Sequence, residues 1–484
     1  MQDFYHIRIN FKGGLVSPGE LQHILTAAKD AGLSDVRFGL RQQLFLHIPH
    51  HFIRQFESTI SSQNIDFQVD ANEYPNIISS YAGEEIFQQG NWLTEGIYKD
   101  VLDNFDYEPR LKINISDNNQ SFTPFFSGHL NFVASANPNF WYLSIRLPKT
   151  NEVFTYNRLV FTNEIAKISY LLEKLINEGI SNPSDLWGAI PQNTIAIDAD
   201  KELELHRFRL PYYEGLNRYG RKSWLGIYRR DELFSIDFLG ELCQICLETK
   251  IGQFCVTPWK SIIVKGIEEK DRSKWSNLLA KYSINVRHAA NELNWQVEDD
   301  SDVALKLKHE LVKYFDKWDL RTFGICFGIK TKPKTEVFAS IMVRKRRFRL
   351  FNLIPSFFVY DISYTKDFDP NGRTKVYFEE GILKFNLAEQ LRRSVLLYNK
   401  QAAENRIEKV EKQLASQSLK VEISTKTVHQ CPACFTIYDA DFGDILNGIE
   451  AGIEFKNLPE NYCCSTCEAP KSEFKEVIVR KQFS

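Results

Sequence analysis

Residues 429–474 read HQCPACFTIYDADFGDILNGIEAGIEFKNLPENYCCSTCEAPKSEF and hold five of the nine cysteines of the chain. Four of the five form two Cys-x-x-Cys pairs. A tight turn between the cysteines of such a pair directs both sulfurs at one point, and two facing pairs form a tetrahedral four-sulfur site for zinc or iron. We therefore predict one metal ion, bound by Cys431, Cys434, Cys464 and Cys467.

The fifth cysteine of the segment, Cys463, leaves two registers open for the third ligand. Only Cys464 stands at the Cys-x-x-Cys spacing from Cys467. We choose Cys464 for this reason and expect the side chain of Cys463 to point away from the metal.

The segment that contains the two pairs resembles rubredoxin. The matching features are Cys431-Pro432-Ala433-Cys434, Tyr438-Asp439, Gly443-Asp444, Gly448-Ile449, Gly452, Phe455, Leu458-Pro459, Tyr462, Cys464-Ser465-Thr466-Cys467, Ala469, Lys471 and Phe474. The resemblance implies one iron ion that cycles between Fe3+ and Fe2+, held by four thiolates with no open coordination position. Ser465 is a departure, because the family usually has proline there. The expected core is aromatic and consists of Tyr438, Phe455, Tyr462 and Phe474.

The composition of the whole chain is that of a globular protein with several domains. It has 484 residues, of which 43% are hydrophobic and 25% are charged. The net charge of −2 argues against nucleic acid as a partner. We see no secretory signal and no apolar run long enough for a membrane span. The expected compartment is the cytoplasm, where clustered cysteines are reduced and available to metals.

The rest of the chain contains a weak internal repeat of a large unit. Residues 4–49 and residues 207–267 both read as strand, helix and strand. The ending VRFGLRQQLFLHIP of the first corresponds to FCVTPWKSIIVKGI of the second, about 218 residues later (255 − 37). In the first copy, Ser17, Pro18 and Glu20 form a helix start with a capping box.

Both copies resemble the ferredoxin-like half-domains of the siroheme nitrite and sulfite reductases. The resemblance implies an α+β fold, with a duplicated nitrite/sulfite reductase-like body followed by a small rubredoxin-type iron domain. The expected domains are a first ferredoxin-like half-domain (1–70), a first reductase-like α/β domain (71–200), the second half-domain (201–270), the second α/β domain (271–385), a helical arm and linker (386–426) and the rubredoxin domain (427–484).

The body departs from that family at the catalytic centre. The reductases bind a [4Fe–4S] cluster through four cysteines, but the first copy here has no cysteine, and the second has only Cys326 near the place of one motif. Cys243 and Cys246 lie in an apolar helical pattern, and Cys255 follows it, so that a second metal site lacks an obvious fourth ligand. We infer a body that has lost its catalytic centre.

Basic residues in the body leave further functions open. Arg37 and Arg41 match positions that contact the siroheme carboxylates in the reductases, and strand alternation would place both on one face. The run VRKRRFRLF, residues 343–351, is typical of a solvated or salt-bridged strand and could also dock an acidic partner. A helix from Asn386, followed by a tether, would carry the C-terminal module.

These observations predict an electron-transfer protein with one iron ion, whose body serves as a docking scaffold. The expected partners are a redox donor and a redox acceptor, with a nitrite or sulfite reductase as a candidate, and neither nucleic acid nor a membrane. One alternative is a siroheme-dependent nitrite or sulfite reductase with the rubredoxin as built-in electron donor. A third interpretation is a structural zinc module on a binding protein.

Overall fold

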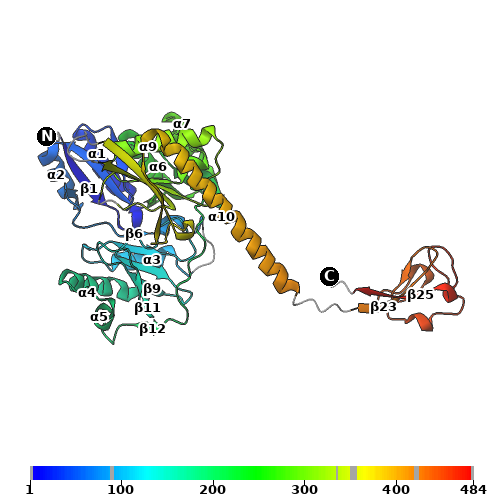
Figure 1. The fold of residues 1–484 in the computed structure, drawn as a ribbon. Coiled ribbons are helices and arrows are strands. Elements are labelled where there is room, and N and C mark those ends of the chain that lie inside the picture. The colour runs from blue at the N-terminus through cyan, green and yellow to red at the C-terminus, as the bar shows by residue number, and fades with distance from the viewer. Residues whose placement is uncertain (1–3, 88–91, 334–335, 349–356, 419–424, 481–484) are drawn as a thin grey trace. The chain divides into compact units, whose positions relative to one another are not determined.

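The computed structural model describes residues 4–87, 92–333, 336–348, 357–418 and 425–480. The chain divides into two compact units, Met1–Tyr398 and Asn399–Ser484, and each is described by itself (Figure 1). We call the first unit the body. The predicted boundaries between smaller domains remain predictions.

Two five-stranded sheets in the body exchange short strands with each other. The first has the order β15-β3-β4-β1-β5 and the second has the order β13-β14-β17-β16-β2. β15 comes from the second half of the body and pairs with β3, while β2 comes from the first half and pairs with β16. The strands of the first sheet are β1 (Phe4–Asn10), β3 (Asp35–Phe38), β4 (Gln43–Pro49), β5 (Gln68–Val69) and β15 (Phe234–Ser235). Those of the second are β2 (Leu15–Val16), β13 (Gly215–Tyr219), β14 (Lys222–Ile227), β16 (Phe254–Val256) and β17 (Ile262–Ile267).

The turns of the β3–β4 and β16–β17 hairpins repeat each other at the predicted spacing. In the first turn, Gly39 donates its N–H to Gln43 O at 2.8 Å, and in the second Thr257 donates to Ser261 O at 3.0 Å. Gln42 (φ 58°) and Lys260 (φ 53°) both adopt the left-handed conformation. These two residues stand 218 positions apart (260 − 42), which confirms the internal repeat.

Four helices cover these sheets, and their apolar faces form one shared core. The helices are α1 (Pro18–Asp30), α2 (Ile53–Ser61), α6 (Ile236–Glu248) and α7 (Arg272–Lys281). Ser17 caps α1 as predicted, since its hydroxyl accepts a hydrogen bond from the Glu20 N–H at 3.4 Å. Core residues include Leu21 and Ile24 of α1 with Leu239 and Leu242 of α6, all completely buried. The two halves therefore share one hydrophobic interior.

Two mixed sheets, one of seven strands and one of five, share a pairing pattern with each other. Each begins with two parallel pairs and continues with antiparallel pairs. The strands of one are β6 (Ile78–Ser79), β7 (Ile113–Ser116), β8 (Leu130–Ala134), β9 (Phe140–Ile145), β10 (Phe154–Thr155), β11 (Arg158–Phe161) and β12 (Ala196–Asp198). Those of the other are β18 (Trp295–Val297), β19 (Phe327–Lys330), β20 (Ile341–Phe348), β21 (Phe357–Thr365) and β22 (Lys375–Ile382).

The remaining helices lie before, between or after the strands of these two mixed sheets along the chain. They are α3 (Glu95–Asp103), α4 (Ile165–Asn177), α5 (Pro183–Gly188), α8 (Ala290–Leu293), α9 (Asp302–Lys317) and α10 (Lys384–Ser418). The long helix α10 begins two residues before the predicted start. Its first turns bury Leu387, Leu391 and Val395 in the body.

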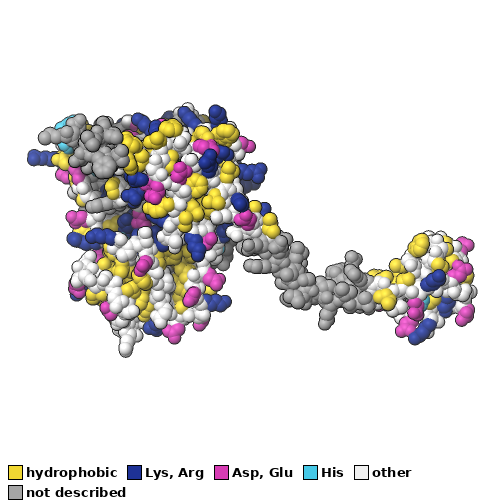
Figure 2. Space-filling view, in the orientation of Figure 1, with side chains coloured by type: hydrophobic (Ala, Val, Ile, Leu, Met, Phe, Trp, Pro, Cys, Tyr) yellow, Lys and Arg dark blue, Asp and Glu magenta, His cyan; other side chains and the backbone are white. Residues whose placement is uncertain are grey.

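The predicted basic run forms most of β20, and Arg349 lies outside the described residues. Arg346 forms an ion pair with Asp361 at 2.7 Å, as expected for a salt-bridged strand. Lys and Arg side chains are interspersed with Asp and Glu over the visible face of the body (Figure 2). None of the helices that the structure describes is long and apolar enough to span a membrane.

The second unit contains a small three-stranded sheet of order β24-β23-β25. Its strands are β23 (Thr425–Gln430), β24 (Ile437–Tyr438) and β25 (Lys475–Arg480). Cys431 and Cys434 lie in the loop between β23 and β24. Cys464 and Cys467 lie in the loop that precedes β25.

Candidate metal centre and basic cavity

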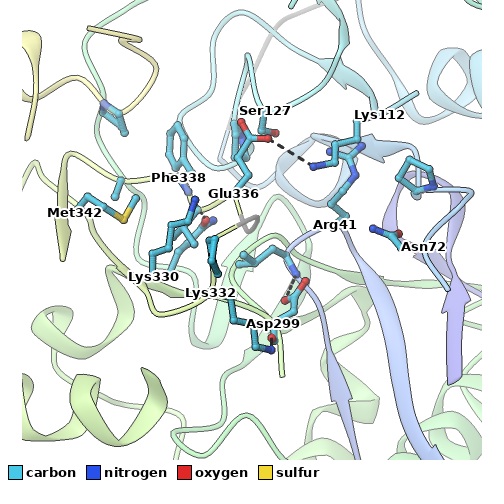
Figure 3. Close-up of a pocket in the computed structure, with 18 of the residues that line it drawn as sticks. Arg41, Asn72, Lys112, Ser127, Asp299, Lys330, Lys332, Glu336, Phe338 and Met342 are labelled. Atoms are coloured by element: carbon cyan, nitrogen blue, oxygen red, sulfur yellow. Dashed lines mark hydrogen bonds and ion pairs between the residues drawn. The ribbon is translucent and has the colours of Figure 1, made fainter. Parts of the chain in front are cut away.

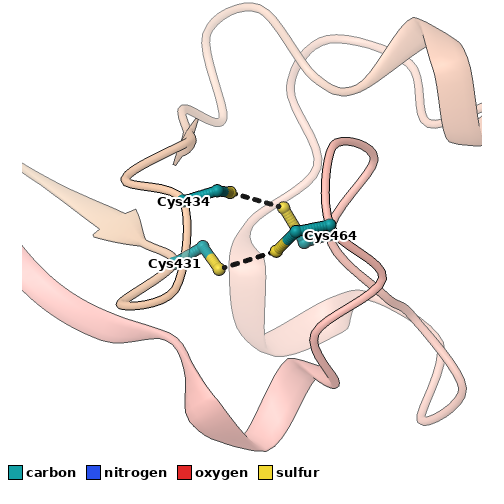
Figure 4. A group of neighbouring side chains, drawn as sticks. Cys431, Cys434 and Cys464 are labelled. Carbon is teal, nitrogen blue, oxygen red and sulfur yellow. Dashed lines mark hydrogen bonds between the residues drawn. The ribbon is translucent and has the colours of Figure 1, made fainter.

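The structure brings the four predicted ligands together. The Sγ atoms of Cys431 and Cys467 are 3.5 Å apart, as are those of Cys434 and Cys464, and all four lie within 4.8 Å of one another (Figure 4). Metal–sulfur bonds of about 2.3 Å in a tetrahedron separate the sulfurs by about 3.8 Å. The four side chains therefore fit a four-coordinate iron or zinc ion with no open position.

Backbone and hydroxyl groups support the thiolates in both pairs. Thr436 donates its backbone N–H to Cys434, two residues before it, and Ala469 does the same for Cys467. The Thr436 hydroxyl also lies 3.0 Å from Cys434 Sγ. Hydrogen bonds from Thr436 lower the pKa of the Cys434 thiol to about 6, because they stabilise its charged form.

The aromatic core beside the centre is as predicted. Tyr438 and Tyr462 are buried with Leu458, and the rings of Phe455 and Phe474 pack against them. Gly443 (φ 69°) has no room for a side chain, since a Cβ atom would lie 2.5 Å from the Ile449 carbonyl oxygen. Because this core is small, we expect the stability of this unit to depend mainly on its tight turns and on a bound metal ion.

Cys463, the cysteine outside the predicted ligand set, and Ser465, the departure from the family pattern, are both accommodated locally. Cys463 is exposed and lies 3.5 Å from the Asn461 carbonyl oxygen, outside the four-sulfur group. Ser465 hydrogen-bonds to the carboxylate of Asp444, which also accepts from the Tyr462 hydroxyl at 2.8 Å. The serine thus joins a hydrogen-bonded cluster that holds the second cysteine loop.

The sequence did not predict one feature of the cysteine loops, a left-handed residue after each pair. The residue after each pair, Phe435 (φ 64°) and Glu468 (φ 61°), adopts the left-handed conformation that glycine favours. Phe435 is 70% exposed beside the ligand Cys434. Figure 2 shows hydrophobic side chains, in yellow, on the surface of this unit. Apolar residues exposed elsewhere on it are Ile437, Phe442, Ile445, Leu446 and Ile478. Both residues stand directly after the second cysteine of a Cys-x-x-Cys pair. This shared position is the signal from which the sequence could have predicted their left-handed conformation.

The described cysteines of the body do not belong to this four-sulfur group. Cys243 and Cys246 of α6 are buried in the shared core, and burial raises the pKa of Cys243 to about 12. Cys255 and Cys326 are also buried, and burial raises the pKa of Cys255 to about 11. Within the ranges that the structure describes, no three of these thiols form a group of metal ligands.

The body contains a cavity of about 1050 Å³ with many basic side chains in its wall. Arg41 and Lys112 come from the first half of the body, and Lys330 and Lys332 come from the second (Figure 3). Further basic residues of the wall are Arg8, Arg146, Lys149, Arg373 and Lys375. Most of these residues are far apart in sequence, and only the fold collects them.

Positive charge exceeds negative charge in this cavity. One carboxylate, that of Glu336, is shared by three cations: Lys112 (3.6 Å), Arg146 (2.8 Å) and Arg373 (3.4 Å). Burial lowers the pKa of Arg41 and of Arg373 to about 10. Burial, with the nearby Arg344, also lowers the pKa values of Lys330 and Lys375. The cavity therefore favours an anionic ligand, which would restore the usual pKa values.

Arg37 and Arg41 do not act together as the strand alternation predicted. Arg41 lies in the turn after β3, where its guanidinium donates to the carbonyl oxygens of Asn76 and Ile113. Arg37 instead pairs with Asp300 at 3.3 Å and with Asp302 at 2.7 Å, and it does not line the cavity. The prediction failed because the chain leaves the strand between the two residues.

Comparisons with known proteins agree with this division of the chain. The rubredoxin family model matches residues 428–474. The chain is 38% identical over 56 residues to a probable rubredoxin, HupI, of Bradyrhizobium diazoefficiens, which covers 12% of this chain and 81% of that protein. It is 34% identical over 58 residues to a probable rubredoxin of Methanothermobacter thermautotrophicus, covering 12% of this chain and 92% of that protein.

A solved structure resembles most of the chain. The Mycobacterium tuberculosis NirA protein matches with a TM-score of 0.61 at 12% sequence identity, covering 81% of this chain and 80% of that one. A likeness at this identity concerns the fold alone. It agrees with the predicted α+β, nitrite/sulfite reductase-like architecture of the body.

Proposed function

The chain belongs to the rubredoxin family through its C-terminal domain, and on this premise we propose that it is an electron-transfer protein with one iron ion at Cys431, Cys434, Cys464 and Cys467. The observation that carries the proposal is the four-sulfur group itself, with sulfurs 3.5 Å apart in two pairs. Iron bound there supplies one-electron chemistry between its ferric and ferrous states.

The residues around the sulfurs suit such a role. Four thiolates retain nearly the same geometry in both oxidation states, so that little reorganisation accompanies the transfer of one electron. Cys431 and Cys464 are buried, whereas Cys467 is exposed and Cys434 is partly exposed. An electron would therefore pass from a donor to the iron, and from the iron to an acceptor, across the exposed edge formed by Cys434 and Cys467.

In this proposal the body is a docking scaffold, and the donor and acceptor are redox proteins. The fold of the body supports a nitrite or sulfite reductase as a candidate partner. The cytoplasm suits the protein as a compartment, because clustered cysteines stay reduced there and available to a metal. The basic residues of β20 suit docking of an acidic redox partner. The C-terminal unit, with nine acidic and five basic residues in 427–484, suits docking of a basic one.

The test is a visible spectrum with metal analysis, on protein from iron-supplied cells that make siroheme. We expect one iron per chain, with thiolate charge-transfer bands that reductant bleaches. Cys431→Ser should abolish the bands, whereas Cys463→Ser should keep them. Zinc in protein from the native source, without a redox wave, would contradict electron transfer and support the structural zinc module.

The basic cavity favours a second candidate, the siroheme-dependent reductase with a fused electron donor. Siroheme carries several carboxylates, and Arg41, Lys112, Arg146 and Lys330 offer cations to them in a cavity of about 1050 Å³. The cysteines of the body do not fit the cluster that accompanies siroheme in the reductases. A tetrapyrrole band in the same spectrum would support this candidate, and nitrite and sulfite reduction would be the next assay.

A further inference from the structure

A second group of metal-binding side chains lies in the body, in the wall of the basic cavity. His6 on β1 and His47 on β4 are direct partners in the antiparallel ladder. Paired residues of such a ladder present their side chains on the same face of the sheet. The two imidazole rings accordingly lie close together, with centroids 4.8 Å apart.

A carboxylate from the second half of the body faces both rings. Asp300 follows β18 and has a left-handed backbone (φ 55°). Its Oδ2 atom lies 3.0 Å from His6 Nδ1 and 3.0 Å from His47 Nε2. Arg37 holds the other oxygen, Oδ1, at 3.3 Å. This ion pair orients the carboxylate, as groups behind a metal ligand commonly do.

We propose that His6, His47 and Asp300 bind a divalent transition-metal ion of the zinc or ferrous-iron class. Their three donor atoms lie within 4.8 Å of one another. Bonds of about 2.0–2.1 Å in a tetrahedron place donor atoms about 3.3 Å apart, so the observed 3.0 Å separations need only a small expansion. Two imidazoles and one carboxylate leave further coordination positions for a ligand.

The surroundings allow an ion to enter. The side chains of His6, His47 and Asp300 are 33%, 32% and 21% exposed, and His6 and Asp300 line the cavity. The ring of Phe4 flanks both imidazoles, with centroid distances of 5.3 Å and 5.1 Å. The site is thus partly enclosed on one side and open on another, as is usual where a metal retains a position for a ligand.

Positively charged side chains near the three residues oppose the binding of a cation, and negatively charged ones nearly offset them. Arg8 and Arg37 are close to the Asp300 carboxylate, and Asp299 and Asp302 offset them. Asp70 also lies beside the cluster and accepts the backbone N–H of His6 at 2.9 Å. The basic wall of the cavity would favour an anion as the additional ligand, which would reduce the net charge that the metal brings.

The same distances are also expected without a metal ion, if the Asp300 carboxylate accepts a hydrogen bond from an N–H group of each imidazole. Cobalt titration of the full-length chain, with its C-terminal site loaded with iron and loosely bound metal removed, decides between the two. Metal analysis after equilibrium dialysis gives the number of bound ions. Cobalt absorption reports the ligands, because nitrogen and oxygen ligands give weak bands without thiolate charge transfer.

We expect one cobalt ion per chain in addition to the iron. His47→Ala and Asp300→Asn should weaken its binding at least about tenfold. His47→Gln keeps an N–H donor for Asp300 but removes the imidazole, so it separates loss of the metal from loss of the fold. His23→Ala, at an exposed histidine of α1, is the control and should bind as the unaltered chain does.

The absence of an additional cobalt ion in the unaltered chain would overturn the proposal. Full binding in a folded His47→Gln variant would overturn it as well, because the ion would then lie elsewhere. Thiolate charge-transfer bands on the added cobalt would have the same consequence.

Discussion

In the C-terminal unit all four sulfurs come from residues 431–467, whereas the body cavity combines Arg41 with Lys330 from opposite halves of the chain. Among the residues that the structure describes, the apolar cluster of the C-terminal unit consists of buried Tyr438, Leu458 and Tyr462 with a few partly buried neighbours. The described part of the body contains extensive apolar cores. The difference indicates that the small unit depends on its metal for stability, while the body depends on burial of apolar surface.

The largest expected effect comes from removing a ligand of the small unit. Cys431→Ser should unfold residues 428–474 and leave the body folded, because metal binding at structural sites contributes about 10 kcal/mol or more. Amide hydrogen exchange measured on the full chain would show loss of protection in the C-terminal unit alone.

The matched control for this prediction is Cys463→Ser, at the exposed cysteine outside the sulfur group. It should retain protection and metal. Unfolding of the body together with the C-terminal unit would contradict the independence of the two regions.

The next largest effect is expected from creating a cavity in the core of the body by mutation. Phe234 of β15 is buried, and its ring packs against Phe38 of β3 at 5.0 Å, where the halves exchange strands. Phe234→Ala should lower the free energy of unfolding by about 3–5 kcal/mol. Denaturant titration would measure this loss, and the iron spectrum should be unchanged.

Phe323→Ala is the corresponding change at a side chain that is 65% exposed. It should cost less than about 1 kcal/mol. Equal losses from the two variants would argue against the exchanged strands as a major source of stability.

A smaller effect should appear in the pH dependence of the body. Burial, with Arg146 and Lys112 nearby, lowers the pKa of His129 to about 3, so this imidazole stays neutral in the folded body. The unfolded chain binds the proton near pH 6.5. Stability should therefore fall as the pH drops from about 6.5 towards 3, by at most a few kcal/mol.

His129→Asn isolates this contribution, because the amide oxygen can replace Nδ1 as acceptor for the Lys112 N–H. Unfolding free energies between pH 7 and pH 4 should depend less on pH in the variant than in the unaltered chain. Parallel curves for the two proteins would rule out His129 as the source.

The smallest effect concerns backbone strain beside the metal. Phe435 has φ 64°, so Phe435→Gly should stabilise the C-terminal unit by up to about 1 kcal/mol. Thermal unfolding of the iron-loaded chain would measure the shift. Ser472→Gly, at an exposed position without positive φ, should instead destabilise the unit slightly.

Much of the small unit could be predicted from sequence because its interactions are local. The spacing of the two cysteine pairs and the positions of Tyr438, Phe455, Tyr462 and Phe474 correspond directly to what the structure places together. The hairpin repeat was also predictable, since each copy is encoded within one continuous stretch. Ser17 and Glu20 likewise interact within one turn of helix.

The failures occurred where distant segments meet. Alternation along a strand placed Arg37 and Arg41 on one face, but the turn after Phe38 separates them, and Asp300 pairs with Arg37. No local pattern joins His6 and His47 to Asp300, because the carboxylate comes from the other half of the body.

The sequence by itself determined which four cysteines come together, the aromatic core beside them and the duplication of the body, since short-range spacing specifies each of these. Only the tertiary structure decided which strands the two halves exchange, which cations surround the cavity and which carboxylate faces the histidine pair. Those arrangements depend on how two similar halves pack together, and packing brings together residues whose separation along the chain carries no signal.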